Sequence, residues 1–536
     1  MKKFILFLTS LIFLTGCGPD IVRIGPTGVP QQMETNLPED DPDEEIEVEA
    51  EPIQAPEPVV ATQAPQDAVL RLSMRHPLTL NPLLNQDVTV ARILRLIFEP
   101  LIIFDENLRP SSHLADIEFA SDFSSVNLTV RSDAIWSDGK PVTADDIIFS
   151  IETLKNAPPA AIYSQNVQSI AQTTRISSRT VQITFNQPSV TVGYALNFPV
   201  IPLHYYQGET NKDSDANMNP VGNGLFILDS HLPMRSVTLA RNPYSFRSRP
   251  QIEQIDVLLL PDEQTELYAL DQGRIDALHL PLTEWIRHHG VRHLRHEILP
   301  AMYFEFIGFN YNRDMFHELH VRQGIAHAFN ADEVVGAVYL AHAVRSVAPI
   351  HPYNWAAGEV VNPAFDQARA QALLDFMRLD LRPYYPLVIL VNEENPQRVS
   401  IARALAQSLN VVGLPSIVAS VPEDEYFYRL DNHDFDLFIG GVNLSFSPDV
   451  SFLFQQNEMF IHDGWLENAF TAMMIATTES AYLQAVANFR QAFAERLPVV
   501  GLAFRHSAVL ADARIENNLN PAPDNVFYGI NEWSLR

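Results

Sequence analysis

The stretch RSDAIWSDGKPVTADDIIFSIETLK, residues 131–155, predicts the end of a strand, a turn and the start of a helix. Just before it, Val126, Leu128 and Val130 alternate with polar residues, as in a half-buried strand. The Ser-Asp-Gly sequence at 137–139 is typical of a turn that ends an extended run. These local signals predict a strand–turn–helix unit.

The helix of this unit carries its own start signal. Thr143 can cap it with Asp146 three residues later, an Asp variant of the capping box. Asp145 and Asp146 also place negative charge at the positive end of the helix dipole. One apolar stripe follows, made of Ile147, Ile148, Ile151 and Leu154. Such signals are packing devices, so the unit by itself predicts a scaffold without chemistry.

The run W-x-DGKP-x-TA-DD-I-x-F-S in this stretch resembles the signature of the family 5 solute-binding proteins, the peptide and nickel receptors of ABC transporters. Further segments resemble other family signatures in the family's order, with departures such as Asn223, Leu225, Gly324 and Asn330. These segments are 219–228, 237–246, 262–280, 321–339 and 365–377. The pattern predicts a helix, a glycine stop at Gly273 and a strand over 262–280, and a helix over 321–339. The resemblance covers about residues 68–536.

The resemblance implies an α/β, two-lobed periplasmic-binding-protein-like fold with a ligand cleft between the lobes. The first lobe would contain 68–310 and 498–536, with an extra subdomain at about 86–200. The second lobe would contain 311–497. Ligand would be enclosed between them by hinge closure.

The first residues predict export. Lys2 and Lys3 precede an apolar run from Phe4 to Leu14, which is too short to span a membrane. Leu14-Thr15-Gly16-Cys17 resembles the lipobox of bacterial lipoproteins, so we expect cleavage of a signal peptide at 1–16 and lipid attachment at Cys17. Because Cys17 is the only cysteine, no internal disulfide is possible. The expected location is extracytoplasmic and lipid-anchored.

Residues 17–67 predict a disordered linker behind the lipidated cysteine. After Cys17 they contain nine prolines, thirteen acidic residues and one arginine, a composition that favours an extended, self-repelling chain. The formal net charge of −29 argues against nucleic acid as a partner. No later run approaches eighteen apolar residues, so lipid alone would hold the protein at the membrane.

The sequence predicts a protein that is not an enzyme. The sequence has no G-x-S-x-G elbow and no H-E-x-x-H motif, and Cys17 is not a free nucleophile once it carries lipid. No cofactor is predicted. A phosphate loop at Gly222 and Gly224 is disfavoured because the lysine and the following Ser or Thr are absent.

A histidine cluster leaves a metal or metal chelate open as an alternative ligand. It consists of His288, His289, His293 and His296, with helical spacing between its last three members. Three interleaved arginines, Arg287, Arg292 and Arg295, oppose a cation, so a solvated basic patch is the favoured interpretation and no metal site is predicted.

The predicted ligand site is the segment 441–446, with Trp355 facing it and Asp449 nearby. In the resemblance, peptide receptors carry Trp where Val442 stands and a carboxylate near Ser445 that pairs with the peptide's α-ammonium. Either Asp449 takes that role or the ligand lacks a free amino terminus, because an unpaired buried ammonium is costly. The predicted ligand-binding residues are Trp355, Asn443, Ser445, Phe446 and Asp449.

Three of these residues also have a structural interpretation that involves no ligand. Trp355 could pack in a core, and Asn443 and Ser445 could satisfy turn backbone. The predicted function is a monomeric receptor that binds a short peptide or similar solute and presents it to an ABC permease. A ligand sensor or a scaffold derived from such a receptor is the alternative of another class.

Overall fold

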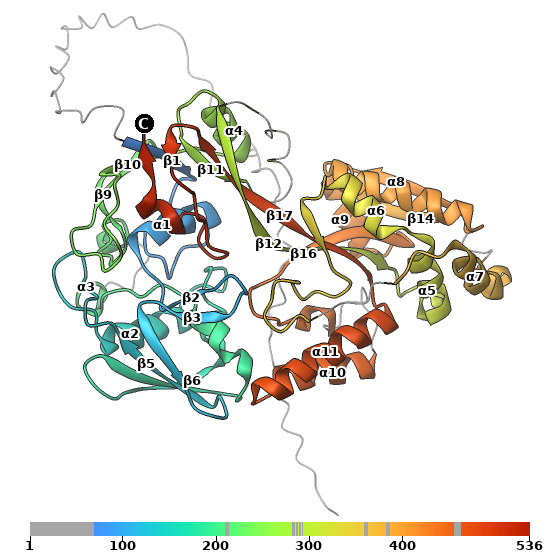
Figure 1. Cartoon of the computed structure of the whole chain (residues 1–536), viewed down its shortest axis with the longest axis horizontal. Helices are drawn as coiled ribbons and strands as arrows, with labels where there is room; N and C mark the ends of the chain where they lie inside the picture. The colour runs from blue at the N-terminus through green and yellow to red at the C-terminus, as the bar shows by residue number, and fades with distance from the viewer. Residues whose placement is uncertain are drawn as a thin grey trace, which may run out of the picture.

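The computed structural model describes residues 69–536 except 209–213, 281–284, 286–287, 289–290, 292, 359–362, 382–385 and 455–462, and Figure 1 shows its arrangement. The predicted signal peptide, the lipid site at Cys17 and the linker lie outside the described residues. So do His289 and two of the interleaved arginines. None of the helices in the described part of the chain is long and apolar enough to span a membrane.

The strand–turn–helix prediction is confirmed. Strand β5 is Ser125–Val130 with alternate residues buried, and helix α2 is Ala144–Lys155. The carboxylate of Asp146 is buried and accepts hydrogen bonds from Thr143 N at 2.8 Å, Leu203 N at 2.8 Å and Trp136 Nε1 at 3.3 Å. The signature residues therefore tie the helix start to the turn, which is a packing role.

Strand β5 belongs to a small antiparallel sheet in the first half of the chain. Its strand order is β4-β5-β7-β6, and α2 packs on β6 and β7. A two-stranded hairpin, β2-β3, precedes it in sequence. The bounds are Ile102–Phe104 for β2, Pro110–Ser112 for β3, Ala115–Phe119 for β4, Ile170–Arg175 for β6 and Thr180–Phe185 for β7.

A second four-stranded sheet has the order β1-β10-β9-β8, with β1 parallel to β10 and the other pairs antiparallel. Its strands are Val69–Met74 (β1), Phe226–Leu232 (β8), Ser236–Arg241 (β9) and Gln254–Leu259 (β10). Helix α1, Val88–Ile97, lies beside it.

The glycines of the 219–228 segment serve the packing of α1. A Cβ on Gly222 would lie 2.1 Å from the Ile97 carbonyl oxygen, and Gly224 N donates to that oxygen at 2.8 Å. Only a residue without a side chain permits this approach. The close contact with α1 explains both glycines without a phosphate loop.

The largest sheet extends from the first half of the chain into the second. Its order is β11-β17-β12-β16-β14-β15, with β13 paired to β17. Figure 1 shows the long strands β12 and β17 crossing between the two halves of the molecule. The bounds are Ala277–Leu280 (β11), Leu294–Phe309 (β12), Ala343–Arg345 (β13), Leu387–Asn392 (β14), Ser416–Val421 (β15), Leu437–Asn443 (β16) and Val500–Asp512 (β17).

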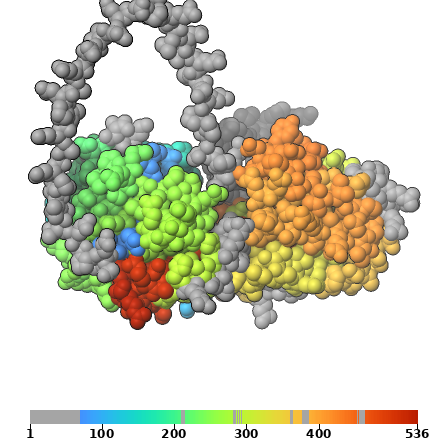
Figure 2. Space-filling view, turned by 90° about the horizontal axis from the view of Figure 1, so that it is seen from above, coloured from blue at the N-terminus to red at the C-terminus, as the bar shows by residue number. Residues whose placement is uncertain are grey.

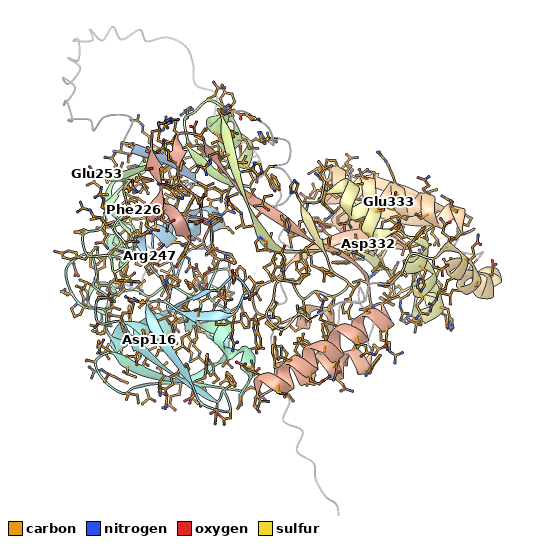
Figure 3. The ribbon with its side chains drawn as sticks, in the orientation of Figure 1. Asp116, Phe226, Arg247, Glu253, Asp332 and Glu333 are labelled. Atoms are coloured by element: carbon orange, nitrogen blue, oxygen red, sulfur yellow. The ribbon has the colours of Figure 1, made fainter. Side chains whose placement is uncertain are left out.

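The helices agree with the sequence pattern except at one point. The predicted helix over 321–339 is two helices, α5 (Leu319–Ala328) and α6 (Ala331–Val338). The break occurs because Asn330 caps α6, its side chain accepting from Glu333 N at 3.4 Å, and Figure 3 shows Asp332 and Glu333 at this helix start. The other helices are Leu203–Tyr206 (α3), Glu263–Asp271 (α4), Gln367–Leu381 (α7), Pro396–Val411 (α8), Glu423–Asp431 (α9), Gly464–Met474 (α10) and Glu479–Arg496 (α11).

Separate apolar cores underlie the two halves, which lie side by side in Figure 2. The core of the first half extends from Leu70 to Val257 and also takes in the C-terminal residues Ile515 to Trp533. Two cores cover the sheet of the second half. Strands β12 and β17 contribute residues to the cores of both halves, so they form the covalent and hydrogen-bonded connection between them.

Candidate functional site

Trp355 lies where the two halves of the molecule meet. Its indole Nε1 donates to the Tyr194 hydroxyl at 3.1 Å, and its backbone N donates to the Asn107 carbonyl at 2.9 Å. The Arg109 guanidinium lies 4.8 Å from the centre of the indole. Trp355 is half-buried, so part of its ring remains reachable. The residue therefore joins the second half to the first.

Further contacts cross the same junction. Val190 N donates to the Ala476 carbonyl at 2.8 Å, and Arg109 forms an ion pair with Glu479 at the start of α11. Asn354 Nδ2 adds a second hydrogen bond to the Tyr194 hydroxyl, at 3.2 Å. Burial raises the pKa of Tyr194, so this hydroxyl stays neutral and accepts both bonds.

Phe446 is another residue of the second half that contacts the first half. Its ring centre is 4.8 Å from that of Phe104 in β2, and Phe104 in turn lies 5.7 Å from Tyr194. Phe446 packs against the core of the first half although it follows β16 of the second. The structure thus brings Trp355 and Phe446, two of the predicted ligand-binding residues, to the neighbouring rings Tyr194 and Phe104 of the first half.

The three polar residues predicted to bind ligand are exposed. Asn443 is the last residue of β16 and lies opposite Tyr303 of β12. Ser445 Oγ donates to the Ser447 carbonyl at 3.2 Å, and Asp449 Oδ1 accepts from Ser451 N at 2.8 Å. The bonds of Ser445 and Asp449 are local turn contacts, and Asn443 alone lies at a strand end. Ligand binding by any of the three stays a prediction.

A buried charge cluster beside Asn443 was missed by the sequence analysis. Glu305 of β12 is fully buried, and its carboxylate accepts from Arg398 Nε at 2.9 Å and lies 2.9 Å from Arg505 Nε. Desolvation by burial lowers the pKa of Arg398, but Glu305, Tyr303 and Tyr426 together raise it more, so it lies well above its ordinary value. The available signal was a charged residue inside an apolar strand, once in YFEFIGF and once in GLAFRHS.

The described histidines of the candidate metal cluster point to different partners. His288 lies 4.0 Å from an Asp271 oxygen, and His296 stacks on Trp285 with ring centres 5.7 Å apart. In the part of the chain that the structure describes, no group of three or more His, Cys, Asp or Glu side chains could hold a metal ion.

The two lobes are joined by long shared strands and have aromatic and polar residues at their junction. This arrangement defines a solute-binding protein of the two-lobed α/β class. The family model for bacterial extracellular solute-binding proteins, family 5, matches residues 110–459. The chain belongs to this family, and the predicted fold class is confirmed.

The curated relatives are distant. An ABC transporter peptide-binding protein of Brucella ovis is 23% identical over 339 residues, which is 61% of this chain and 64% of the relative. The match thus spans less than two thirds of that protein. The oligopeptide-binding protein AppA of Bacillus subtilis is 21% identical over 503 residues, 86% of this chain and 90% of AppA.

Solved structures show the same fold. The ABC transporter substrate-binding protein CtaP of Listeria monocytogenes matches with a TM-score of 0.76 at 18% identity, covering 87% of this chain and 99% of CtaP. NikZ of Campylobacter jejuni, solved with Ni(L-His), has a TM-score of 0.67 at 20% identity, covering 88% of this chain and 100% of NikZ.

Proposed function

We propose that the protein is a lipid-anchored extracytoplasmic receptor that encloses a short peptide or similar small solute between its lobes and delivers it to an ABC permease. The observation that carries this proposal is the position of Trp355 and Phe446. Both were predicted from sequence to contact ligand, and both lie where residues of one lobe meet residues of the other. A solute held there would touch both lobes, so binding would favour the closed arrangement.

Peptide is the ligand class favoured by the relatives, since the Brucella ovis and Bacillus subtilis proteins are named for peptide binding. A metal chelate is the second candidate, and the specific observation in its favour is the fold match to NikZ, which holds Ni(L-His). Both ligands are small polar solutes, so the same junction could serve either.

Tryptophan fluorescence tests the proposal. Trp136, Trp285 and Trp533 are fully buried within the lobes and Trp465 is exposed on α10, whereas Trp355 lies at the junction. A pool of short peptides added to the full chain should change the emission of Trp355 and reduce the radius of gyration in X-ray scattering. Nickel with histidine forms a second arm. No change in either measurement with either probe would contradict the receptor function and favour the scaffold alternative.

Asn443 and Ser445 are proposed to hydrogen-bond the main chain of the solute without supplying charge. N-acetylation of a bound peptide should therefore change its calorimetric affinity little. A large loss on acetylation would show that a carboxylate, such as Asp449, anchors an ammonium group, because an unpaired buried ammonium costs several kcal/mol.

The anchor is tested separately from the site. Wild-type protein should incorporate a labelled fatty acid and remain with membranes, and Cys17→Ala should do neither. Normal processing and membrane retention of Cys17→Ala would refute lipid attachment at this residue.

A further inference from the structure

The two halves of the molecule meet at a second place, in addition to the connecting strands β12 and β17. There the turn between β2 and β3 and the segment 189–194 of the first half contact the second half. Val190 N donates to the Ala476 carbonyl at 2.8 Å, and the Val190 side chain is buried in a core of the second half. Figure 1 shows α11 extending from the start of β17 toward the small sheet. These contacts form only when the two halves are close together.

The turn between β2 and β3 fixes the backbone of Arg109. Asp105 Oδ1 accepts hydrogen bonds from Asn107 N and Arg109 N, both at 2.9 Å. Leu108 is fully buried and has a left-handed backbone, with a φ of 59°. A residue other than glycine keeps this conformation only where its surroundings determine it. The turn therefore presents Arg109 to the second half from a defined position.

The Arg109 guanidinium has two partners in the second half. It forms an ion pair with Glu479, the first residue of α11, and it lies 4.8 Å from the centre of the Trp355 indole, where a cation is attracted to the ring. The side chains of Arg109 and Glu479 are 46% and 47% exposed, so salt can screen the ion pair. Because both partners belong to the other half, Arg109 stabilises a closed arrangement relative to an open one.

The Trp355 indole is held by further contacts at the same place. Its Nε1 donates to the Tyr194 hydroxyl at 3.1 Å, and its backbone N donates to the Asn107 carbonyl at 2.9 Å. The ring of Tyr482 in α11 lies 5.3 Å from the indole, measured between ring centres. The indole donor is thus already used within the protein, and the reachable part of the half-buried ring is what Trp355 offers to a solute.

We infer that Arg109 is a positioning residue, which together with Glu479 holds the Trp355 ring at the lobe junction and favours the closed arrangement of the lobes. The role of Trp355 toward ligand rests on the proposed function, whereas closure can be measured without ligand. An exposed ion pair and an exposed cation–π contact together shift such an equilibrium by roughly three- to thirtyfold. Loss of Arg109 should weaken ligand affinity by up to about this factor.

The test compares Arg109→Gln with a matched control, Arg131→Gln. Arg131 forms an ion pair with Asp133 at 2.9 Å, with side chains 40% and 54% exposed, and its guanidinium lies 4.7 Å from the centre of the Phe246 ring. These partners all lie in the first half. Arg131→Gln therefore removes the same two kinds of contact without affecting the contact between the halves.

Both variants are made in a Trp465→Phe background, because Trp465 is exposed and the tryptophans other than Trp355 are then all fully buried. Without ligand and at low salt, Arg109→Gln should increase the radius of gyration in X-ray scattering and the quenching of Trp355 by acrylamide. Arg131→Gln should change neither. At about 1 M salt the Debye length falls to about 3 Å, so the protein with Arg109 should approach Arg109→Gln. Glu479→Gln should show less of this salt dependence.

If Arg109→Gln matched Arg131→Gln in both measurements at low salt, the inference would be overturned. A salt dependence that persists undiminished in both Arg109→Gln and Glu479→Gln would also overturn it, because the screened contact would then lie elsewhere.

Ligand binding is measured separately, with a pool of short peptides, equilibrium dialysis and mass spectrometry. Peptides retained by the protein with Arg109 should bind Arg109→Gln more weakly, by up to roughly thirtyfold. Equal retention by the two proteins would overturn the positioning role. If no peptide were retained while Arg109→Gln still opened the lobes, the inference about closure would stand and peptide as the ligand class would fail.

Discussion

Replacement of Glu305 by glutamine should destabilise the second lobe strongly. The substitution keeps the shape of the side chain but removes its charge, so two buried guanidiniums lose their counter-charge. The amide NH₂ group of glutamine would also face Arg398 or Arg505 with a hydrogen-bond donor, where the carboxylate of Glu305 has an acceptor. Both effects act on groups that water does not reach, so neither is relieved by solvent.

The expected magnitude follows from the burial of all three side chains. Breaking a buried pair by removing one partner costs about 3–5 kcal/mol. For a unit of about 150–250 residues, each kcal/mol lowers the melting temperature by roughly 2–4 °C, which gives a decrease of roughly 6–20 °C. Scanning calorimetry of the full chain at pH 7 measures it directly.

Asp332→Asn is the matched control for Glu305→Gln. It makes the same chemical change in an ion pair with Arg345, at 2.7 Å, but the Asp332 side chain is 67% exposed. An exposed pair contributes about 0–1 kcal/mol, so the melting temperature should decrease by only a few degrees. If Glu305→Gln shifted the transition no more than Asp332→Asn, the reasoning about the uncompensated buried charges would be wrong.

Three further outcomes are expected. Burial lowers the pKa of His351 to about 3, so the stability that depends on its neutral form is present above pH 6.5 and is lost as the pH falls from 6.5 toward 3. Between pH 7 and 4, the melting temperature should therefore fall more steeply with pH for wild type than for His351→Gln. Parallel plots of melting temperature against pH would exclude this role. Trp355→Phe should abolish most of the ligand-linked fluorescence change while the far-ultraviolet circular dichroism is retained; an undiminished change would assign the signal to another tryptophan. Gly222→Ala should clearly lower the urea concentration at the unfolding midpoint, because the new Cβ would meet the carbonyl at the end of α1. Gly336→Ala, at a helix position with open space around it, should raise that midpoint slightly. Equal effects of the two substitutions would refute the steric argument.

The local elements were predictable because their signals are local. The alternating residues of β5, the cap of α2 and the glycine after α4 lie within a few residues of the structure they specify. The break between α5 and α6 was missed although its signal, Asn330, was visible. Its neighbours continue the apolar pattern on both sides, and periodicity alone does not show that a cap interrupts a helix.

The sequence by itself determined the family, through ordered signatures, and it placed Trp355 and Phe446 in segments that the structure brings to the lobe junction. Only the tertiary structure decided what these residues contact. Trp355 and Tyr194 are 161 residues apart, and Glu305 and Arg398 are 93 residues apart, so no local spacing connects them. A carboxylate in an apolar strand predicts a buried partner, but the identity of that partner depends on which strands and helices pack against it. The excess positive charge around Glu305 arises in the same way, because two arginines from separate elements meet one acid only after the sheet has formed.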